Sequence, residues 1–175
     1  MSIELSVSGH EQAYVCGFCF DSDRQTVILI EKSKPDWQAG RYNGVGGKVE
    51  PGETASEAMR REFYEEAGVE LPATGDGPDV WIPFCILGWG EGEGPGDGAG
   101  QVVFFRAISD VAVRDVRTVE TEPIRRIALG DVLRPGTVRS QCLPNLRWLI
   151  PLALDPDDTV VRGRIGGSLR AEPAD

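Results

Sequence analysis

The stretch from Gly47 to Val69, GKVEPGETASEAMRREFYEEAGV, constrains the fold more than any other part of the chain. Thr54 and Glu57 have the spacing of a capping box, in which each side chain satisfies a free N–H of the first helical turn. Gly68 can take the left-handed conformation that closes a helix. The spacing therefore predicts a helix that starts at Thr54 and stops at Gly68.

The acidic residues of this helix lie on an unexpected side. At about 100° per residue, Glu62 and Glu66 project onto the apolar stripe and Glu65 lies at its edge. Carboxylates this close together repel each other and resist desolvation. A divalent cation would compensate, and hard oxygen ligands select magnesium, manganese or calcium over softer metals. A solvated acidic turn is the alternative interpretation. The apolar stripe consists of Ala55, Ala58, Met59 and Phe63.

The spacing of the whole stretch resembles the Nudix box of the Nudix hydrolase superfamily. The matching positions are Gly47, Glu53, Arg61, Glu62, Phe63, Glu65, Glu66, Gly68 and Val69. The resemblance implies an α/β fold, a Nudix-type α/β/α sandwich with a mixed sheet. It also implies a pyrophosphohydrolase that acts on acid anhydrides with Mg²⁺, or Mn²⁺ as a substitute.

The resemblance assigns roles to the acids. It implies that Glu65 and Glu66 are metal ligands and that Glu62 is either a ligand or the general base. It adds the main-chain carbonyl of Gly46 as a further ligand. In this chemistry, metal ions neutralise the phosphate oxygens and lower the pKa of bound water, whose proton a carboxylate accepts.

Four other residues are weaker candidates. Arg61 and Glu53 are expected to pair with or orient the acids, and a purely structural ion pair is the alternative. A further acidic ligand from outside the box is expected at Glu122, which we favour over Glu120. An exposed turn acid is the alternative for both.

The glycine-rich loop GRYNGVGGKV, residues 40–49, resembles that of the oxidised purine nucleoside triphosphatases, the 8-oxo-dGTP diphosphatase type. In that family, the asparagine at the position of Asn43 contacts the base, and an amide offers both a donor and an acceptor to a purine edge. Lys48 and Arg41 are candidates for phosphate contacts, with a solvated surface charge as the alternative for each.

A late segment, LPNLRW, is placed like the second base-reading element of that family. The family has two adjacent aspartates there, whereas this chain has Asn145 and Leu146. Asn145 can still form a hydrogen bond with a base, but this element no longer implies strict selectivity for 8-oxo-guanine. Trp148 can either stack on a base or pack in the core.

These observations predict a metal-dependent hydrolase that cleaves nucleoside triphosphates to monophosphate and pyrophosphate, with oxidised purine nucleotides as candidate substrates for pool sanitation. Two alternatives stay open. One is hydrolysis of a nucleoside diphosphate linked to another group, such as ADP-ribose or a dinucleoside polyphosphate, because the box handles only the pyrophosphate. The other is a non-catalytic nucleotide-binding sensor on the same fold.

The chain of 175 residues is expected to form one domain over residues 1–175. Its net charge of -10 argues against a nucleic-acid polymer or an anionic membrane as partner, but not against a small nucleotide. The chain shows no signal region and no membrane-spanning run, so we expect a cytoplasmic protein. Its charge does not determine the oligomeric state.

The motif CGFC contains Cys16 and Cys19, which raises the question of a zinc or redox site. The motif lies in an apolar run that is typical of a strand, where these two side chains would point to opposite faces. Cys85 and Cys142 stand alone and supply no second ligand pair. We therefore expect four small, buried or half-buried hydrophobic residues in a reducing compartment.

The remaining elements follow from periodicity and turn signals. A helix is expected over residues 143–154, and residues 111–119 are ambiguous, with an extension of the sheet as one interpretation. An acidic, glycine-rich loop over residues 88–100 is expected to be mobile, and the tail after about residue 166 to fray. Strands are expected over residues 13–20, 26–31, 80–88, 101–108, 124–129 and 158–165.

Overall fold

Two long apolar strands form the centre of the sheet. The computed structural model describes residues 12–165 except 74, 76, 78, 91–98 and 158. In it, β1 (Gln12–Phe20) and β5 (Gly100–Ile108) pair in parallel along their whole length. Both strands are largely buried, as expected for strands that are covered on both faces.

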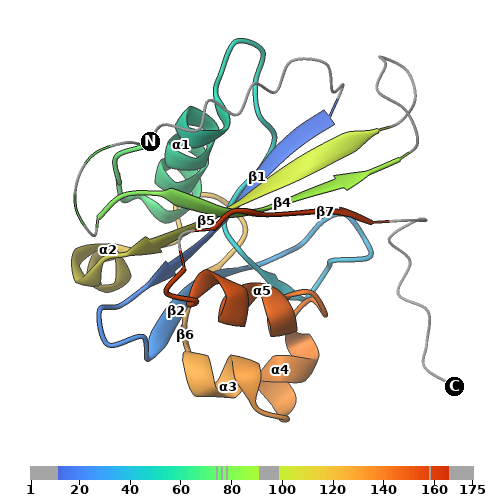
Figure 1. Cartoon of the computed structure of the whole chain (residues 1–175). Coiled ribbons are helices and arrows are strands. Elements are labelled where there is room, and N and C mark those ends of the chain that lie inside the picture. Colours follow the sequence, from blue (N-terminus) through green and yellow to red (C-terminus); the bar gives the residue numbers. More distant parts are fainter. Residues whose placement is uncertain are drawn as a thin grey trace, which may run out of the picture.

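Shorter strands extend this pair into a seven-stranded mixed sheet, in which six strands follow the order β3-β2-β1-β5-β4-β7 and the seventh, β6, pairs with β2 (Figure 1). On one side, β2 (Thr26–Glu31) pairs antiparallel with β1, β3 (Tyr42–Asn43) and β6 (Ile124–Ala128). On the other side, β4 (Ile82–Trp89) runs antiparallel to β5, and β7 (Val161–Ile165) runs parallel to β4. The six predicted strands are confirmed, with ends shifted by up to three residues.

Helices cover both faces of the sheet, and a separate apolar core fills each side (Figure 1). One core lies under α1 (Ala55–Ala67) and α2 (Asp110–Asp115). The other lies under α3 (Leu129–Leu133), α4 (Thr137–Gln141) and α5 (Leu146–Ala153). This arrangement is the predicted α/β/α sandwich.

The predicted ends of α1 are confirmed. The Thr54 backbone N–H donates to Glu57 Oε2 at 2.8 Å, and the Glu57 backbone N–H donates to Thr54 Oγ1 at 3.2 Å. Gly68 closes the helix with a φ of 68° and donates its N–H to the carbonyl of Tyr64 at 2.9 Å. The helix that bears the acids is therefore fixed at both ends by its own sequence.

The interpretation of residues 111–119 as a further strand is wrong. The segment begins with α2, whose first turn is capped by Ser109, because Oγ accepts the Ala112 N–H at 3.1 Å. Ala112, Val113 and Val116 are buried, a spacing that suits a helix. The short helices α3 and α4 were not predicted. The mobile loop and the frayed tail lie mostly or wholly outside the described residues.

The two cysteines of the CGFC motif point to opposite faces, as predicted. Cys19 belongs to the core under α1 and Cys16 to the core under α5. Burial raises the pKa of both thiols to about 12, so both stay protonated at neutral pH. All four cysteines are free and buried, which supports their interpretation as small hydrophobic residues.

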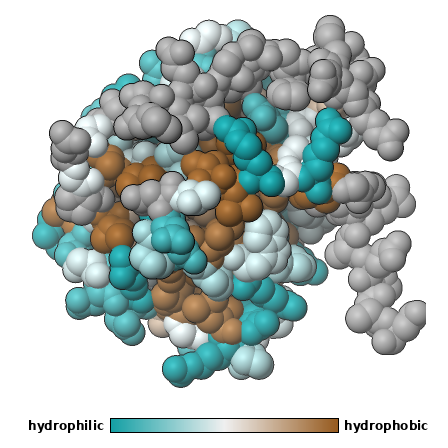
Figure 2. Space-filling model, in the orientation of Figure 1, coloured by the Kyte–Doolittle hydropathy of each residue, from teal (hydrophilic) through white to brown (hydrophobic). Residues whose placement is uncertain are grey.

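The surface mixes hydrophilic and apolar residues. On the face shown in Figure 2, apolar residues are exposed across the middle, with hydrophilic residues around them. Such exposure is ordinary for folded proteins. None of the helices in the described ranges combines the length and apolar character needed to cross a bilayer.

Candidate active site

Backbone hydrogen bonds hold the glycine loop before α1 against the central strand β1. Val15 N–H donates to the Gly47 carbonyl at 2.9 Å, and Gly17 and Val45 exchange two backbone hydrogen bonds. Gly46 has a φ of 154°, and a Cβ atom there would lie 2.2 Å from the Val15 carbonyl oxygen. Only glycine allows this close approach, which brings the loop over the acidic end of α1.

Two of the predicted acids face this loop. Glu66 is 8% exposed, and its Oε2 accepts the backbone N–H of Gly46 at 3.1 Å. Glu62 lies against Gly47, because a Cβ atom there would come within 2.5 Å of Glu62 Oε1. The prediction that these two glutamates lie on the inner side of the helix is confirmed, and Glu65, with 46% of its side chain exposed, lies at the edge.

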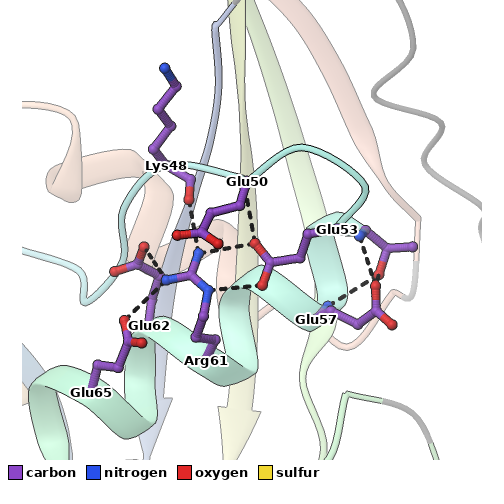
Figure 3. Close-up of polar contacts among 8 residues, drawn as sticks. Lys48, Glu50, Glu53, Glu57, Arg61, Glu62 and Glu65 are labelled. Atoms are coloured by element: carbon purple, nitrogen blue, oxygen red, sulfur yellow. Dashed lines mark hydrogen bonds and ion pairs between the residues drawn. The ribbon is translucent and has the colours of Figure 1, made fainter.

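Arg61 connects the acids of the motif (Figure 3). Its Nε and Nη2 contact the two carboxylate oxygens of Glu53 at 2.8 and 3.0 Å, a bidentate pair. Its Nη1 contacts Glu62 Oε1 at 2.8 Å and Glu65 Oε2 at 3.0 Å. Nη2 also donates to the carbonyl of Lys48 at 3.0 Å. The expected pairing of Arg61 with Glu53 is therefore present, and it extends to two further acids.

Burial sets the protonation of the inner acids. It raises the pKa of Glu66 to about 7, opposed by the nearby Lys32 ammonium and reinforced by Glu62. It also raises the pKa of Glu62, although Arg61 acts in the opposite direction. Both carboxylates would be easier to ionise beside an additional positive charge.

The donor set suits a hard divalent cation. Glu62, Glu65 and Glu66 offer only carboxylate oxygens, and two of them are partly desolvated beside a loop that leaves room for no side chain. As the side chains stand, no three His, Cys, Asp or Glu residues of the described part converge in a way that could hold a metal ion. Arg61 Nη1 bridges two of the acids, and the Gly46 N–H binds the third. Ligation by the Gly46 carbonyl stays a prediction.

Glu122 is buried, whereas Glu120 is exposed. The Glu122 carboxylate binds the Lys32 ammonium at 2.5 Å. It also accepts hydrogen bonds from the Ser33 backbone N–H at 2.5 Å and from the Ser33 hydroxyl at 2.9 Å. Burial alone would raise the pKa of Glu122, but these hydrogen bonds outweigh it and lower the pKa to about 2. Glu122 lies close enough to Glu66 to influence its pKa, so a role beside the cation also stays a prediction.

The predicted base-binding residues come from two parts of the chain that the fold brings together. Tyr42 forms a β-bridge with Cys142, and its carbonyl accepts the Leu143 N–H at 3.0 Å. This bridge places the turn that contains Asn145 beside β3, which contains Asn43. Asn145 is half-buried at the start of α5.

Trp148 is 46% exposed, so it is not a core residue. Leu146, which occupies the place of the second family aspartate, is fully buried and belongs to the core under α5. Lys48 is exposed, and its ammonium points away from the acids in Figure 3. Arg41 is half-buried, and its backbone carbonyl accepts the Lys32 N–H at 2.9 Å.

Sequence reasoning missed two polar residues of this region. Lys32 binds Glu122, and the side-chain oxygen of Gln38 accepts a hydrogen bond from Asn43 Nδ2 at 3.2 Å. Both belong to the polar loop between β2 and β3, whose path the periodicity did not predict. The proline and tryptophan of that loop gave no signal for either contact.

Comparison with known proteins identifies the kind of domain that carries these residues. A model of the NUDIX domain matches residues 10–124. A stretch of 44 residues, 25% of the chain, is 48% identical to the oxidized purine nucleoside triphosphate hydrolase of Danio rerio and covers 28% of that protein. A stretch of 80 residues, 42% of the chain, is 36% identical to 8-oxo-dGDP phosphatase NUDT18 of Homo sapiens and covers 24% of it. The chain thus matches about a quarter of the length of these relatives.

The fold is also found among solved structures. The MutT protein from Bacillus halodurans has a TM-score of 0.62 to this chain at 19% sequence identity. The similarity covers 90% of this chain and 91% of that protein. At this level of identity, the comparison shows a common fold.

Proposed function

The chain belongs to the NUDIX domain family, and from this we propose that it hydrolyses nucleoside triphosphates to monophosphate and pyrophosphate, with oxidised purine nucleotides as its preferred substrates. The observation that carries this proposal is the position of the acids. Glu62 and Glu66 face a glycine loop on the inner side of α1, where free carboxylates are costly to bury. Such a cluster serves to bind a cation that also binds a diphosphate.

Magnesium, with manganese as a substitute, is the proposed cofactor, and Glu65, Glu66 and Glu62 are the residues that would hold it. When bound, the ion would neutralise phosphate charge and lower the pKa of the attacking water. Glu62 either completes the ligand set or accepts the proton of that water. Arg61 keeps the acids in position, because its bidentate contact with Glu53 fixes the guanidinium.

The base is proposed to bind between the two segments that meet at Tyr42. Asn43 supplies an amide on β3, and Asn145 supplies a second amide from the turn before α5. Trp148 exposes an indole one helical turn further along. Arg41 and Lys48 are the proposed phosphate contacts. We place this activity in the cytoplasm, in keeping with four free thiols.

The test is incubation of the full chain and Mg²⁺ with dGTP, 8-oxo-dGTP, the other nucleoside triphosphates and ADP-ribose, followed by product analysis. We expect pyrophosphate and the nucleoside monophosphate from at least one triphosphate. Ribose 5-phosphate from ADP-ribose as the main product would replace the triphosphate assignment with the diphosphate-linked alternative. Pyrophosphate release from none of the triphosphates would end the proposal.

The variant E66Q should lose turnover by about a hundredfold or more, because the charge at the cation site is lost with little change in shape. E57Q is the matched control, since Glu57 lies on the same helix in the capping box. E57Q should keep its turnover at a slightly lower stability. Full activity in E66Q would contradict the assigned role.

A further inference from the structure

The chemistry of its neighbours determines which way the Asn43 amide faces. One terminal atom of the side chain lies 2.8 Å from the backbone N–H of Gly44. A backbone N–H can only donate, so this atom is Oδ1. The Cys16 Sγ lies 3.8 Å from the same oxygen, as a second, weak donor. Nδ2 therefore faces the other way, toward Gln38.

The orientation of Gln38 follows from the same reasoning. Asn43 Nδ2 can only donate, so the Gln38 atom 3.2 Å away is Oε1, and Nε2 lies on its other side. Two backbone hydrogen bonds hold the turn: Gln38 N–H donates to the Pro35 carbonyl at 2.8 Å, and Arg41 N–H donates to the Gln38 carbonyl at 2.9 Å. The two amides are thus ordered by contacts within this loop.

Hydrogen-bonding capacity remains on both amides. Each side chain is half-buried, so part of it faces solvent. Over the described ranges, Gln38 Nε2 has no acceptor, and Asn43 Nδ2 has only Gln38 as a partner. The pair therefore presents three groups in sequence: a Nδ2 hydrogen, the second lone pair of Oε1, and the hydrogens of Nε2. This order is donor, acceptor, donor.

Guanine oxidised at C8 carries the complementary edge. Its O6 accepts, its N7 carries a hydrogen and donates, and its O8 accepts. N7 and O8 share the carbon C8, as Oε1 and Nε2 share the amide carbon of Gln38, so the two units can form a paired two-point contact. Ordinary guanine presents acceptors at both O6 and N7, which would set N7 against Oε1. Adenine has an amine donor at C6, which would face Nδ2.

We propose that Gln38 and Asn43 together read the C8-oxidised edge of a guanine nucleotide, with Gln38 as the residue that separates it from ordinary guanine. Asn43 Nδ2 contacts O6, Gln38 Oε1 accepts from N7, and Gln38 Nε2 donates to O8. The assignment deepens the proposed function and rests on it for the site. It also supplies the selectivity that the loss of the paired aspartates at Asn145 and Leu146 leaves without a source.

The test measures binding of the monophosphates 8-oxo-dGMP and dGMP by titration calorimetry, so that no turnover is needed. The wild-type chain should bind 8-oxo-dGMP about tenfold or more tightly than dGMP, because a mismatched polar pair is costly in a hydrogen-bonding site. Q38L should weaken binding of 8-oxo-dGMP by about tenfold and change that of dGMP by less than about threefold. The preference should therefore disappear.

Two further variants separate recognition from folding. Q38E keeps the acceptor for Asn43 Nδ2 and for N7 but sets a second acceptor against O8, so it should weaken binding of 8-oxo-dGMP and reduce the preference. Q25L removes a matched glutamine on the β1–β2 turn, whose Nε2 donates to the Asp23 carbonyl at 3.1 Å, and it should keep the preference. Thermal unfolding of each variant confirms that it is folded.

An equal affinity of the wild-type chain for both nucleotides would overturn the assignment, as would no binding of either. An unchanged preference in folded Q38L would do the same. These results differ from failure of the proposed function: a binding preference without pyrophosphate release leaves the Gln38 assignment standing. Conversely, equal kcat/KM values for dGTP and 8-oxo-dGTP would overturn this assignment and leave the hydrolase standing.

Discussion

At the scale of single residues, two buried glutamates near each other have opposite pKa shifts. Glu66 accepts one backbone N–H, and burial raises its pKa to about 7. Glu122 accepts hydrogen bonds from Lys32 and from both the backbone and the hydroxyl of Ser33, and these lower its pKa to about 2. The number and charge of the donors decide the sign, since both side chains are buried.

Glu122 should therefore contribute to stability in a defined range of pH. Its pKa is about 2 in the folded chain against an ordinary value of 4.5, so its contribution is complete above pH 4.5 and is lost as the pH falls toward 2. As the pH falls from 4.5 to 2, the unfolding free energy of the wild type should drop by up to about 3 kcal/mol more than that of E122Q. Urea unfolding at a series of pH values measures the difference.

E120Q is the control for this measurement, because Glu120 is exposed on the same segment. Its acid dependence should equal that of the wild type. An acid dependence of E122Q that matches the wild type would show that the hydrogen bonds of Glu122 do not stabilise the fold. Glu66 acts in the opposite sense: its contribution is present below pH 4.5 and is lost as the pH rises through about 7.

At the scale of elements, the glycine loop and α1 form one unit. A Cβ atom on Gly46 would meet the backbone of β1, whereas the three atoms nearest to a Cβ on Gly47 all belong to the Glu62 carboxylate. A backbone atom cannot move away without disturbing the sheet, but a carboxylate can rotate. The two neighbouring glycines should therefore respond differently to the same substitution.

G47A should displace the Glu62 carboxylate at a cost of less than about 1 kcal/mol in unfolding free energy, while turnover falls about tenfold or more. G46A should destabilise the fold by about 2 kcal/mol or more, because a methyl group meets the Val15 carbonyl at a left-handed φ. Denaturant unfolding and turnover, measured on both variants, separate the two effects. Similar losses of stability in both would contradict this distinction.

Much of this unit could be predicted from the sequence. The ends of α1 depend on local contacts between Thr54, Glu57 and Gly68, and the side of the helix that bears Glu62 and Glu66 follows from helical spacing. Local rules are reliable when a segment satisfies its own backbone groups. The same rules predicted the strands, whose apolar runs are long and bounded by turns.

The rest depends on contacts between distant parts of the chain. Residues 111–119 contain valines that favour a strand, but Ser109 caps a helical turn and the core accepts only Ala112, Val113 and Val116. Glu122 and Lys32 are 90 residues apart, so their pairing has no local signal. The amide pair of Gln38 and Asn43 required the path of a loop that has no periodic pattern.

Across the chain as a whole, the sheet separates the two cores that support the candidate cation site and the candidate base site. The core under α1 positions the acids, and the core under α5 positions the segment that meets β3. The candidate base site and the candidate cation site both lie next to the glycine loop, which contains β3 and precedes α1. A ligand that contacts both sites would therefore interact with residues supported by both cores.

Cation binding should accordingly stabilise the whole chain. At about a hundredfold excess over its dissociation constant, Mg²⁺ should add about 2.7 kcal/mol and raise the Tm by about 5–10 °C. Thermal scans with Mg²⁺ and then with a chelator measure the shift and its reversal. The double variant E65Q/E66Q is the control, and a shift in it as large as in the wild type would place the ion elsewhere.

The five N–H groups of Arg61 have a consequence for how the ion arrives. Because Nη1 already bridges Glu62 and Glu65, the proposed cation would take over oxygens that a guanidinium held before it. Metal uptake at this helix would then exchange one cationic partner for another, so Glu62 and Glu65 would have a positive neighbour both before and after. The proposed ion would have to displace a resident competitor, so it should be held less tightly and released more readily than at a site without one.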